Sequence, residues 1–169
     1  VLPLQEGLLF HAQLGDAASF YNTIMSIELI GELVVERLRD ALEAVLHHHP
    51  QLGALFDYES GSAALQLLPL VAATERRWPW MQVDLSGLAP LDQAAELSRL
   101  EQLELQRNFT IATPQAGVLL QAVLIKQSQQ QHTLCLNVHH LVVDGWSTPI
   151  LLRDLLRACH HLKVLRCPK

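Results

Sequence analysis

The stretch VHHLVVDGWS, from Val138 to Ser147, combines residue types that can do acid–base chemistry. Two adjacent histidines follow an apolar run, and Asp144 and Gly145 come shortly after them. A neutral imidazole can accept a proton from an amine, and its ordinary pKa of about 6.5 suits that role. Gly145 allows the backbone to turn with a positive φ or to approach a ligand closely. The stretch therefore predicts a strand that ends in a reactive histidine and is followed by a tight loop.

The alternation of side chains along a strand separates the two histidines. His140 continues the face of Leu134, Leu136 and Val138, so we expect it to point towards the interior or a tunnel. Burial there would lower the pKa of the ring and keep it neutral near pH 7. The alternative is a pair of core histidines before a turn and a helix cap. The HHxxxDG spacing at a strand-to-loop junction favours a functional role for His140.

Two other kinds of site are open to a chain with nine histidines and three cysteines. The run His47 to His49 invites a metal, but it falls at an expected helix end, where consecutive side chains splay apart. No histidine pair with a carboxylate at ligand spacing occurs on one element, so we expect no metal site. There is no GxSxG stretch and no cysteine in an activating setting, which disfavours a covalent acyl-enzyme. One histidine doing acid–base or positioning work is the simpler scheme.

Periodicity predicts the elements that position these residues. The apolar run over 118–126 suggests a strand covered on both faces. Ser147 is a good helix N-cap, with Pro149 in the first turn. The resulting fold class is an α/β or α+β sandwich, with a central mixed sheet flanked by helices. We expect strands over 23–30, 52–56, 64–68, 81–85, 118–126 and 132–140, and helices over 3–11, 34–47 and 91–106 and from Ser147 onwards.

Length and composition narrow the class of protein. The 169 residues suffice for one domain or one lobe of a larger one, and half of them are hydrophobic. A formal net charge of -5 argues against nucleic acid and anionic membrane as partners. The sequence has no signal peptide and no apolar run long enough to span a bilayer. Three cysteines without CxxC spacing indicate reduced thiols and a cytoplasmic location. Because the chain starts at Val1, we expect a piece of something longer.

Several stretches together resemble the condensation domains of nonribosomal peptide synthetases. VHHLVVDGWS resembles the HHxxxDG motif of that family, and LPLQEGLLFHAQ (Leu2 to Gln13) resembles its first core motif. The QEG-LFH form is closer to members that take a D-configured donor, or to dual epimerising members, than to the L-donor form. HHPQLGALF (His48 to Phe56) falls at the second motif, and RNFTIATPQAGVLLQAVLI resembles the stretch before the catalytic strand.

The resemblance implies a chloramphenicol-acetyltransferase-like fold, with residues 1–169 as the amino-terminal lobe of a domain whose carboxy-terminal lobe is absent. It implies peptide bond formation between thioesters on upstream and downstream carrier proteins, through their phosphopantetheine arms and with no directly bound cofactor. His140 would bind or deprotonate the attacking amine. Gly145, Trp146 and Ser147 would lie on the substrate-tunnel or oxyanion side. Asp144 would be a structural anchor paired with an arginine, and His139 would be structural.

The chain departs from the family at two arginine positions of the second motif, which hold His48 and Gly53. Arg37, Arg39 or a protonated His48 could pair with Asp144 instead. Two further functions stay open: a lobe of a coenzyme A-type acyltransferase, and a degenerate module that only docks carriers. An apolar face left by the missing lobe predicts self-association of the chain.

Overall fold

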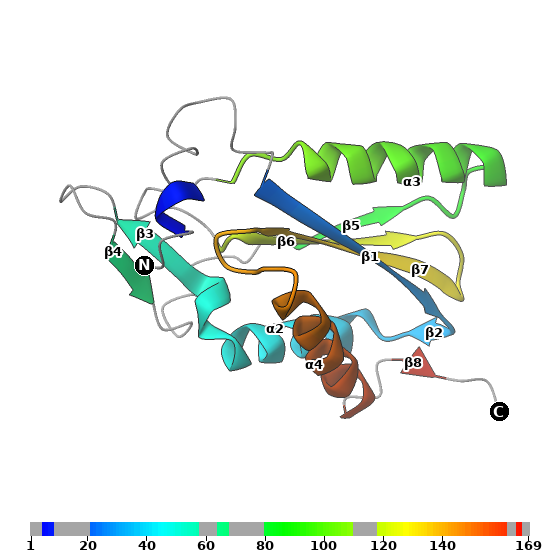
Figure 1. The fold of residues 1–169 in the computed structure, drawn as a ribbon. Helices are drawn as coiled ribbons and strands as arrows, with labels where there is room; N and C mark the ends of the chain where they lie inside the picture. The colour runs from blue at the N-terminus through cyan, green and yellow to red at the C-terminus, as the bar shows by residue number, and fades with distance from the viewer. Residues whose placement is uncertain are drawn as a thin grey trace.

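The computed structural model describes residues 5–8, 21–57, 64–67, 80–109, 118–161 and 165–166. A four-stranded sheet with the order β1-β7-β6-β5 lies at its centre (Figure 1). The pairs β1–β7 and β7–β6 are antiparallel and β6–β5 is parallel, so the sheet is mixed, as expected. The four strands are β1 Asn22–Ile30, β5 Trp80–Asp84, β6 Leu120–Lys126 and β7 Gln131–His139.

Helices cover both faces of this sheet (Figure 1). Helix α3 (Pro90–Leu105) lies on one face, and α2 (Val35–His48) and α4 (Ser147–His161) lie on the other. Residues 5–8 form a helical turn; the remainder of the helix expected over 3–11 falls outside the described residues. The small elements are β2 Glu32–Leu33, the 3₁₀ turn Pro50–Gly53, β3 Ala54–Asp57, β4 Ala64–Leu67 and β8 Leu165–Arg166.

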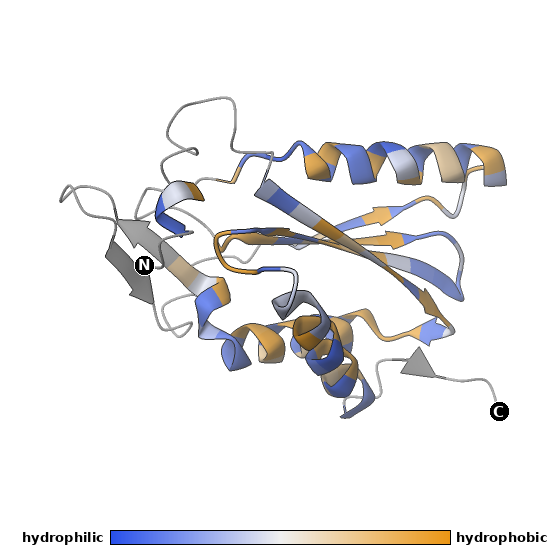
Figure 2. Cartoon of the chain, in the orientation of Figure 1, coloured by the Kyte–Doolittle hydropathy of each residue, from blue (hydrophilic) through white to orange (hydrophobic). Residues whose placement is uncertain are grey.

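The core follows from the two central strands: β6 carries mostly hydrophobic residues, and β7 alternates hydrophobic with polar ones (Figure 2). Leu134, Leu136 and Val138 of β7 pack with the buried residues of α2 and α4. Cys135 points the other way and packs near Leu97 and Leu100 of α3. Both faces of β6 are buried up to its last residue, which confirms the expectation for an unbroken apolar run.

The expected ends of helices and strands agree closely with the structure where the apolar periodicity is strong. They differ from it where a turn interrupts the pattern. Strand β1 ends at Gly31, whose φ of 118° suits glycine alone, and α2 ends before Pro50. Leu52 was expected in a strand but lies in the 3₁₀ turn that precedes β3. Strand β7 stops at His139, so His140 lies in the following turn. Among the described residues, no helix is long and apolar enough to cross a bilayer.

Candidate active site

His139, the last residue of β7, is fully buried. Its ring lies near those of Tyr21 and Phe109, at centroid distances of 6.3 and 6.1 Å. Its Nδ1 accepts a hydrogen bond of 3.1 Å from the amide of Leu141, and its own amide donates to the carbonyl of Leu119. The ring thus holds the turn that follows the strand. This is the environment of a structural side chain, as expected for His139.

His140 lies on the opposite side of the strand end and is exposed. Its Nε2 is 2.8 Å from the hydroxyl of Thr23, which stands opposite Val138 in the β1–β7 register and so shares that face. The separation of the two histidines is therefore confirmed. The expected burial of His140 is wrong, because β7 ends one residue earlier and the turn carries the ring past the edge of the core.

Both ring nitrogens of His140 have hydrogen-bond partners. Nδ1 lies 3.3 Å from the carbonyl oxygen of Val143, and a carbonyl can only accept. Nδ1 is therefore the donor to this carbonyl, and in the tautomer that carries its proton on Nδ1 the Thr23 hydroxyl donates to the lone pair of Nε2. The main-chain amide of His140 donates to the carbonyl of Tyr21 at 2.8 Å. This arrangement leaves Nε2 as the basic atom, and it faces the exposed side of the loop.

Asp144 caps the start of α4. Its Oδ1 accepts hydrogen bonds from the amides of Trp146 and Ser147, at 3.1 and 2.7 Å, and from the Ser147 hydroxyl. Its carbonyl accepts from the amide of Thr148. These are the contacts of an N-cap with the second and third residues after it. Ser147, expected to be the N-cap, is instead the third residue of this first turn.

The hydrogen bonds from Ser147 and the helix start also account for the charge of Asp144. They lower the pKa of its carboxyl group, with the Ser147 hydroxyl as the largest cause. The side chain is exposed, so it is not a carboxylate tucked away without a partner. The arginine that the family resemblance implied is not needed to stabilise this charge.

Gly145, Trp146 and Ser147 follow on the exposed side of the loop. Of the described glycines, only Gly31 has a positive φ, so the turn does not require glycine at position 145. A Cβ atom added to Gly145 would meet nothing within 4 Å. The space next to the Cα atom of Gly145 is therefore open. Trp146 is 87% exposed, which is unusual for so large an aromatic side chain.

The first motif lies against the same loop. Gln5 donates a hydrogen bond of 2.9 Å from its Nε2 to the carbonyl of Leu141, which is 136 residues further along the chain. The bond joins the QEG stretch to the turn between His139 and Asp144. The structure therefore brings together the two motifs on which the family resemblance chiefly depends.

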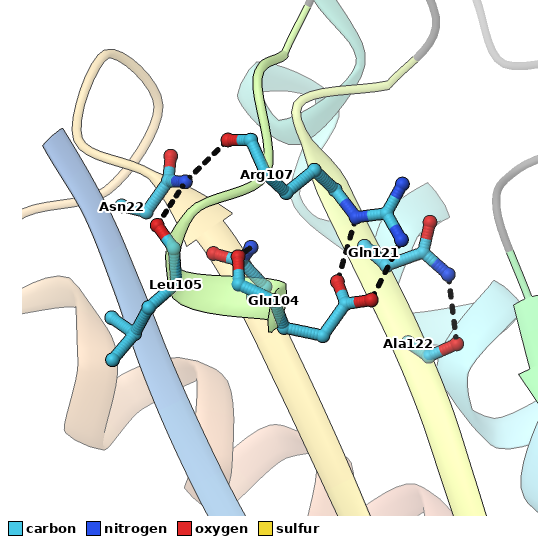
Figure 3. Close-up of polar contacts among 7 residues, drawn as sticks. Asn22, Glu104, Leu105, Arg107, Gln121 and Ala122 are labelled. Atoms are coloured by element: carbon cyan, nitrogen blue, oxygen red, sulfur yellow. Dashed lines mark hydrogen bonds and ion pairs between the residues drawn. The ribbon is translucent and has the colours of Figure 1, made fainter. Parts of the chain in front are cut away.

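The end of α3 is fixed to the sheet beside this site (Figure 3). The Asn22 side chain donates to the carbonyls of Leu105 and Arg107, at 3.1 and 2.7 Å, and that of Asn137 donates to the carbonyl of Glu104. Glu104 also holds Arg107 through two hydrogen bonds of 2.7 and 2.6 Å, which raise the pKa of the guanidinium. Asparagines from β1 and β7 thus satisfy carbonyls that a helix end leaves unpaired.

The second motif lies at the end of α2, and its Leu52 and Ala54 belong to the same buried cluster as Leu141, Val142 and Val143 of the histidine loop. His48 and His49 are in edge-to-face contact, with ring centroids 4.9 Å apart, and His49 Nε2 is 3.0 Å from Oδ2 of Asp154 in α4. Gly53 ends the 3₁₀ turn and is buried. The expectation that consecutive histidines here splay apart is wrong for this pair, because His49 leaves the helix with φ −116° and ψ 75°.

Comparison with known proteins assigns the family. The model of the condensation domain matches residues 1–166. Vanchrobactin synthetase VabF of Vibrio anguillarum is 45% identical over 157 residues, which are 93% of this chain and 5% of that protein. Tyrocidine synthase 2 of Brevibacillus parabrevis is 30% identical over 154 residues, which are 91% of this chain and 4% of that protein. The chain belongs to the condensation domain family, which confirms the resemblance stated from its motifs.

A solved structure agrees with this assignment at the level of the fold. The first condensation domain of the calcium-dependent antibiotic synthetase superposes with a TM-score of 0.82 at 22% identity, over all of this chain and 39% of that one. The chloramphenicol-acetyltransferase-like fold, with helices on both faces of a mixed sheet, is therefore confirmed.

The sequence did not reveal two side chains that hold the site. Thr23 contacts His140 from 117 residues away, and Tyr21 supports both histidines from the start of β1. Neither has a motif around it, and their roles depend on the β1–β7 register. The apolar alternation of β1 and β7 was the only signal that could have paired these strands.

Proposed function

We propose that this chain carries the acid–base histidine of an amide-forming condensation between two carrier-bound thioesters. The observation that carries the proposal is the geometry of His140: Nδ1 is held by a carbonyl, and Nε2 is basic and faces the open side of the HHxxxDG loop. Family membership and the peptide synthetase relatives support the same reaction.

In the proposed step, the amine of the acceptor aminoacyl thioester attacks the thioester carbonyl of the donor. The new C–N bond forms and the C–S bond breaks. His140 Nε2 takes the proton that the amine loses and returns it to the departing sulfur, so no external acid or base is consumed. At rest, the Thr23 hydroxyl occupies Nε2, and the amine would displace it.

Positioning would contribute as much as proton transfer, because both substrates are tethered. Gly145 has open space at its Cα and would let the thioester approach the backbone. Trp146 and Ser147 would line the approach to it, on the tunnel side. Asp144 would fix the loop through the start of α4 and would not itself touch substrate. The phosphopantetheine arms belong to upstream and downstream peptidyl carrier proteins.

We also propose that residues 1–169 form the amino-terminal lobe, and that a carboxy-terminal lobe completes the tunnel over His140. The exposure of His140 and of Trp146 supports this, since both lie where a second lobe would cover them. The chain without that lobe is expected to self-associate. Sedimentation that stays monomeric over a wide range of concentration would count against this expectation. A cytoplasmic location is part of the same proposal, supported by free Cys135 and Cys159.

The test joins this chain to its natural downstream lobe and supplies two loaded carrier proteins. The proposal predicts that dipeptidyl thioester forms on the acceptor carrier. Donors of D and L configuration are compared, because the first motif suggests a member that takes a D-configured donor or a dual epimerising member. Coenzyme A thioesters in place of the donor carrier should support no comparable rate. Equal activity with coenzyme A thioesters would favour the soluble-donor acyltransferase. Carrier binding without any product would favour the docking module.

A further inference from the structure

The structure describes the rings of adjacent histidines at three places in the chain. The placement of the two rings relative to each other differs among these places. His139 and His140 point to opposite sides of a strand end. His160 and His161 lie in the last turn of α4, with ring centroids 6.1 Å apart. His48 and His49 are closer, at 4.9 Å, because α2 ends between them.

The pair at the end of α2 has a carboxylate beside it, that of Asp154. Among the described residues, His48, His49 and Asp154 form the one group of three metal-ligating side chains whose ligand atoms all lie within 4.8 Å of one another. His49 and Asp154 are partly buried, at 16 and 13% exposure, and come from helices that pack together. Two imidazoles and one carboxylate are a ligand set that suits zinc and similar divalent metals.

We propose that His48, His49 and Asp154 form a binding site for a divalent transition metal of the zinc class, which links the end of α2 to α4. Nothing in the condensation reaction uses this cluster, so the proposal stands apart from the proposed function.

The geometry needs only a small change to accept a metal. Ligand bonds of about 2.0–2.2 Å place the ligand atoms of a tetrahedral site roughly 3.4 Å apart. The distance from His49 Nε2 to Asp154 Oδ2 is already 3.0 Å. His48 is exposed, so its ring can rotate towards the other two without disturbing the core. Water would complete the coordination on the exposed side.

The surroundings of Asp154 orient its carboxylate for this role. Arg153 Nε donates to Oδ1 at 2.9 Å, and an Arg157 nitrogen is 3.7 Å from the same oxygen. Both contacts use Oδ1, so Oδ2 remains directed at His49. Carboxylate ligands in metal sites are commonly held by such outer hydrogen bonds.

A metal at this site would act on α4, the helix that follows the loop carrying His140. Asp144 caps the start of α4. Further along the same helix, the Asp154 side chain contacts His49 at the end of α2. A metal would add a cross-link between the two helices on that face of the sheet. We therefore expect zinc to raise the thermal stability of the chain.

The test titrates the full 169-residue chain with Co²⁺ and Zn²⁺ at pH 7.5, followed by the visible cobalt spectrum, calorimetry and thermal unfolding. The expected result is one metal per chain and a higher melting temperature. H48Q should weaken binding by roughly 10- to 100-fold or more and abolish the shift in melting temperature. Because His48 is exposed, H48Q should fold as the parent does.

The matched control is H160Q, which removes an exposed histidine of the other helix-end pair. The proposal requires H160Q to bind one metal as tightly as the parent. D154N should lose affinity like H48Q. Unchanged binding by H48Q overturns the proposal, as does a parent chain that binds no metal. Equal losses from H48Q and H160Q would also overturn it, because they would show scattered surface binding.

Discussion

Replacing each histidine of the HHxxxDG motif by alanine should separate folding from chemistry. The ring of His139 is fully buried, and truncating a buried side chain of this size costs about 2–3 kcal/mol. The amide of Leu141 would also lose its acceptor, at a cost of about 1–3 kcal/mol. We therefore expect His139→Ala to lower the free energy of unfolding by about 3–6 kcal/mol. His140→Ala removes an exposed ring and should change it by less than about 0.5 kcal/mol.

The assay is urea unfolding followed by tryptophan fluorescence and circular dichroism, with the slope of the transition compared among variants. His139→Asn is the matched control, because its side-chain oxygen can accept from Leu141 while the ring is still lost. It should recover about 1 kcal/mol or more relative to His139→Ala. Similar losses for His139→Ala and His140→Ala would refute the separation of roles, as would a negligible loss for His139→Ala.

Three further predictions concern the site and the thiols. Thr23→Val should shift the nitrogen resonances of His140, because the ring loses its contact with the hydroxyl, whereas Thr23→Ser should preserve them. Unchanged resonances in the valine variant would contradict the contact. Gly145→Ala should leave the melting temperature within about 2 °C of the parent value, because a Cβ atom meets nothing there. The same variant should lower the rate of product formation roughly tenfold. Full activity would show that no ligand approaches this backbone. Desolvation raises the pKa of Cys135 and of Cys159 from 9.0 to about 11, so their stabilising effect is complete below about pH 9 and is lost as the pH rises to 11. As the pH rises over this range, the urea concentration at the midpoint of unfolding should fall by more in the parent chain than in the variant with both cysteines replaced by alanine. An identical decline in both proteins would count against the pKa shifts.

Most of the sheet and its helices could be predicted from the sequence, since each has a strong apolar period. Strand β1 and helix α3 begin within one residue of the expected positions. Helix α4 begins at Ser147, as expected, but the side chain that caps it is Asp144 and not Ser147. Ser147 followed by Pro149 is the more conspicuous capping signal, although aspartate is as good an N-cap as serine.

The remaining features depend on contacts between distant parts of the chain. Alternation correctly placed His140 on the face of Val138, but it could not show that β7 ends one residue before His140. The contact of Thr23 with His140 and that of His49 with Asp154 join residues 117 and 105 positions apart. Spacing within one element gives no information about such pairs. The same limit explains why the histidine run before Pro50 was not expected to share a carboxylate.

The central claim is that His140 Nε2 accepts the proton of the attacking amine. The most direct measurement is the single-turnover rate of dipeptidyl thioester formation by the His140→Ala variant of this chain joined to its downstream lobe. Two loaded carriers supply the substrates, and circular dichroism checks that the variant is folded. The account predicts a fall of roughly 10²- to 10⁴-fold in a variant that is folded and still binds its carriers. A variant that keeps the full rate would contradict it.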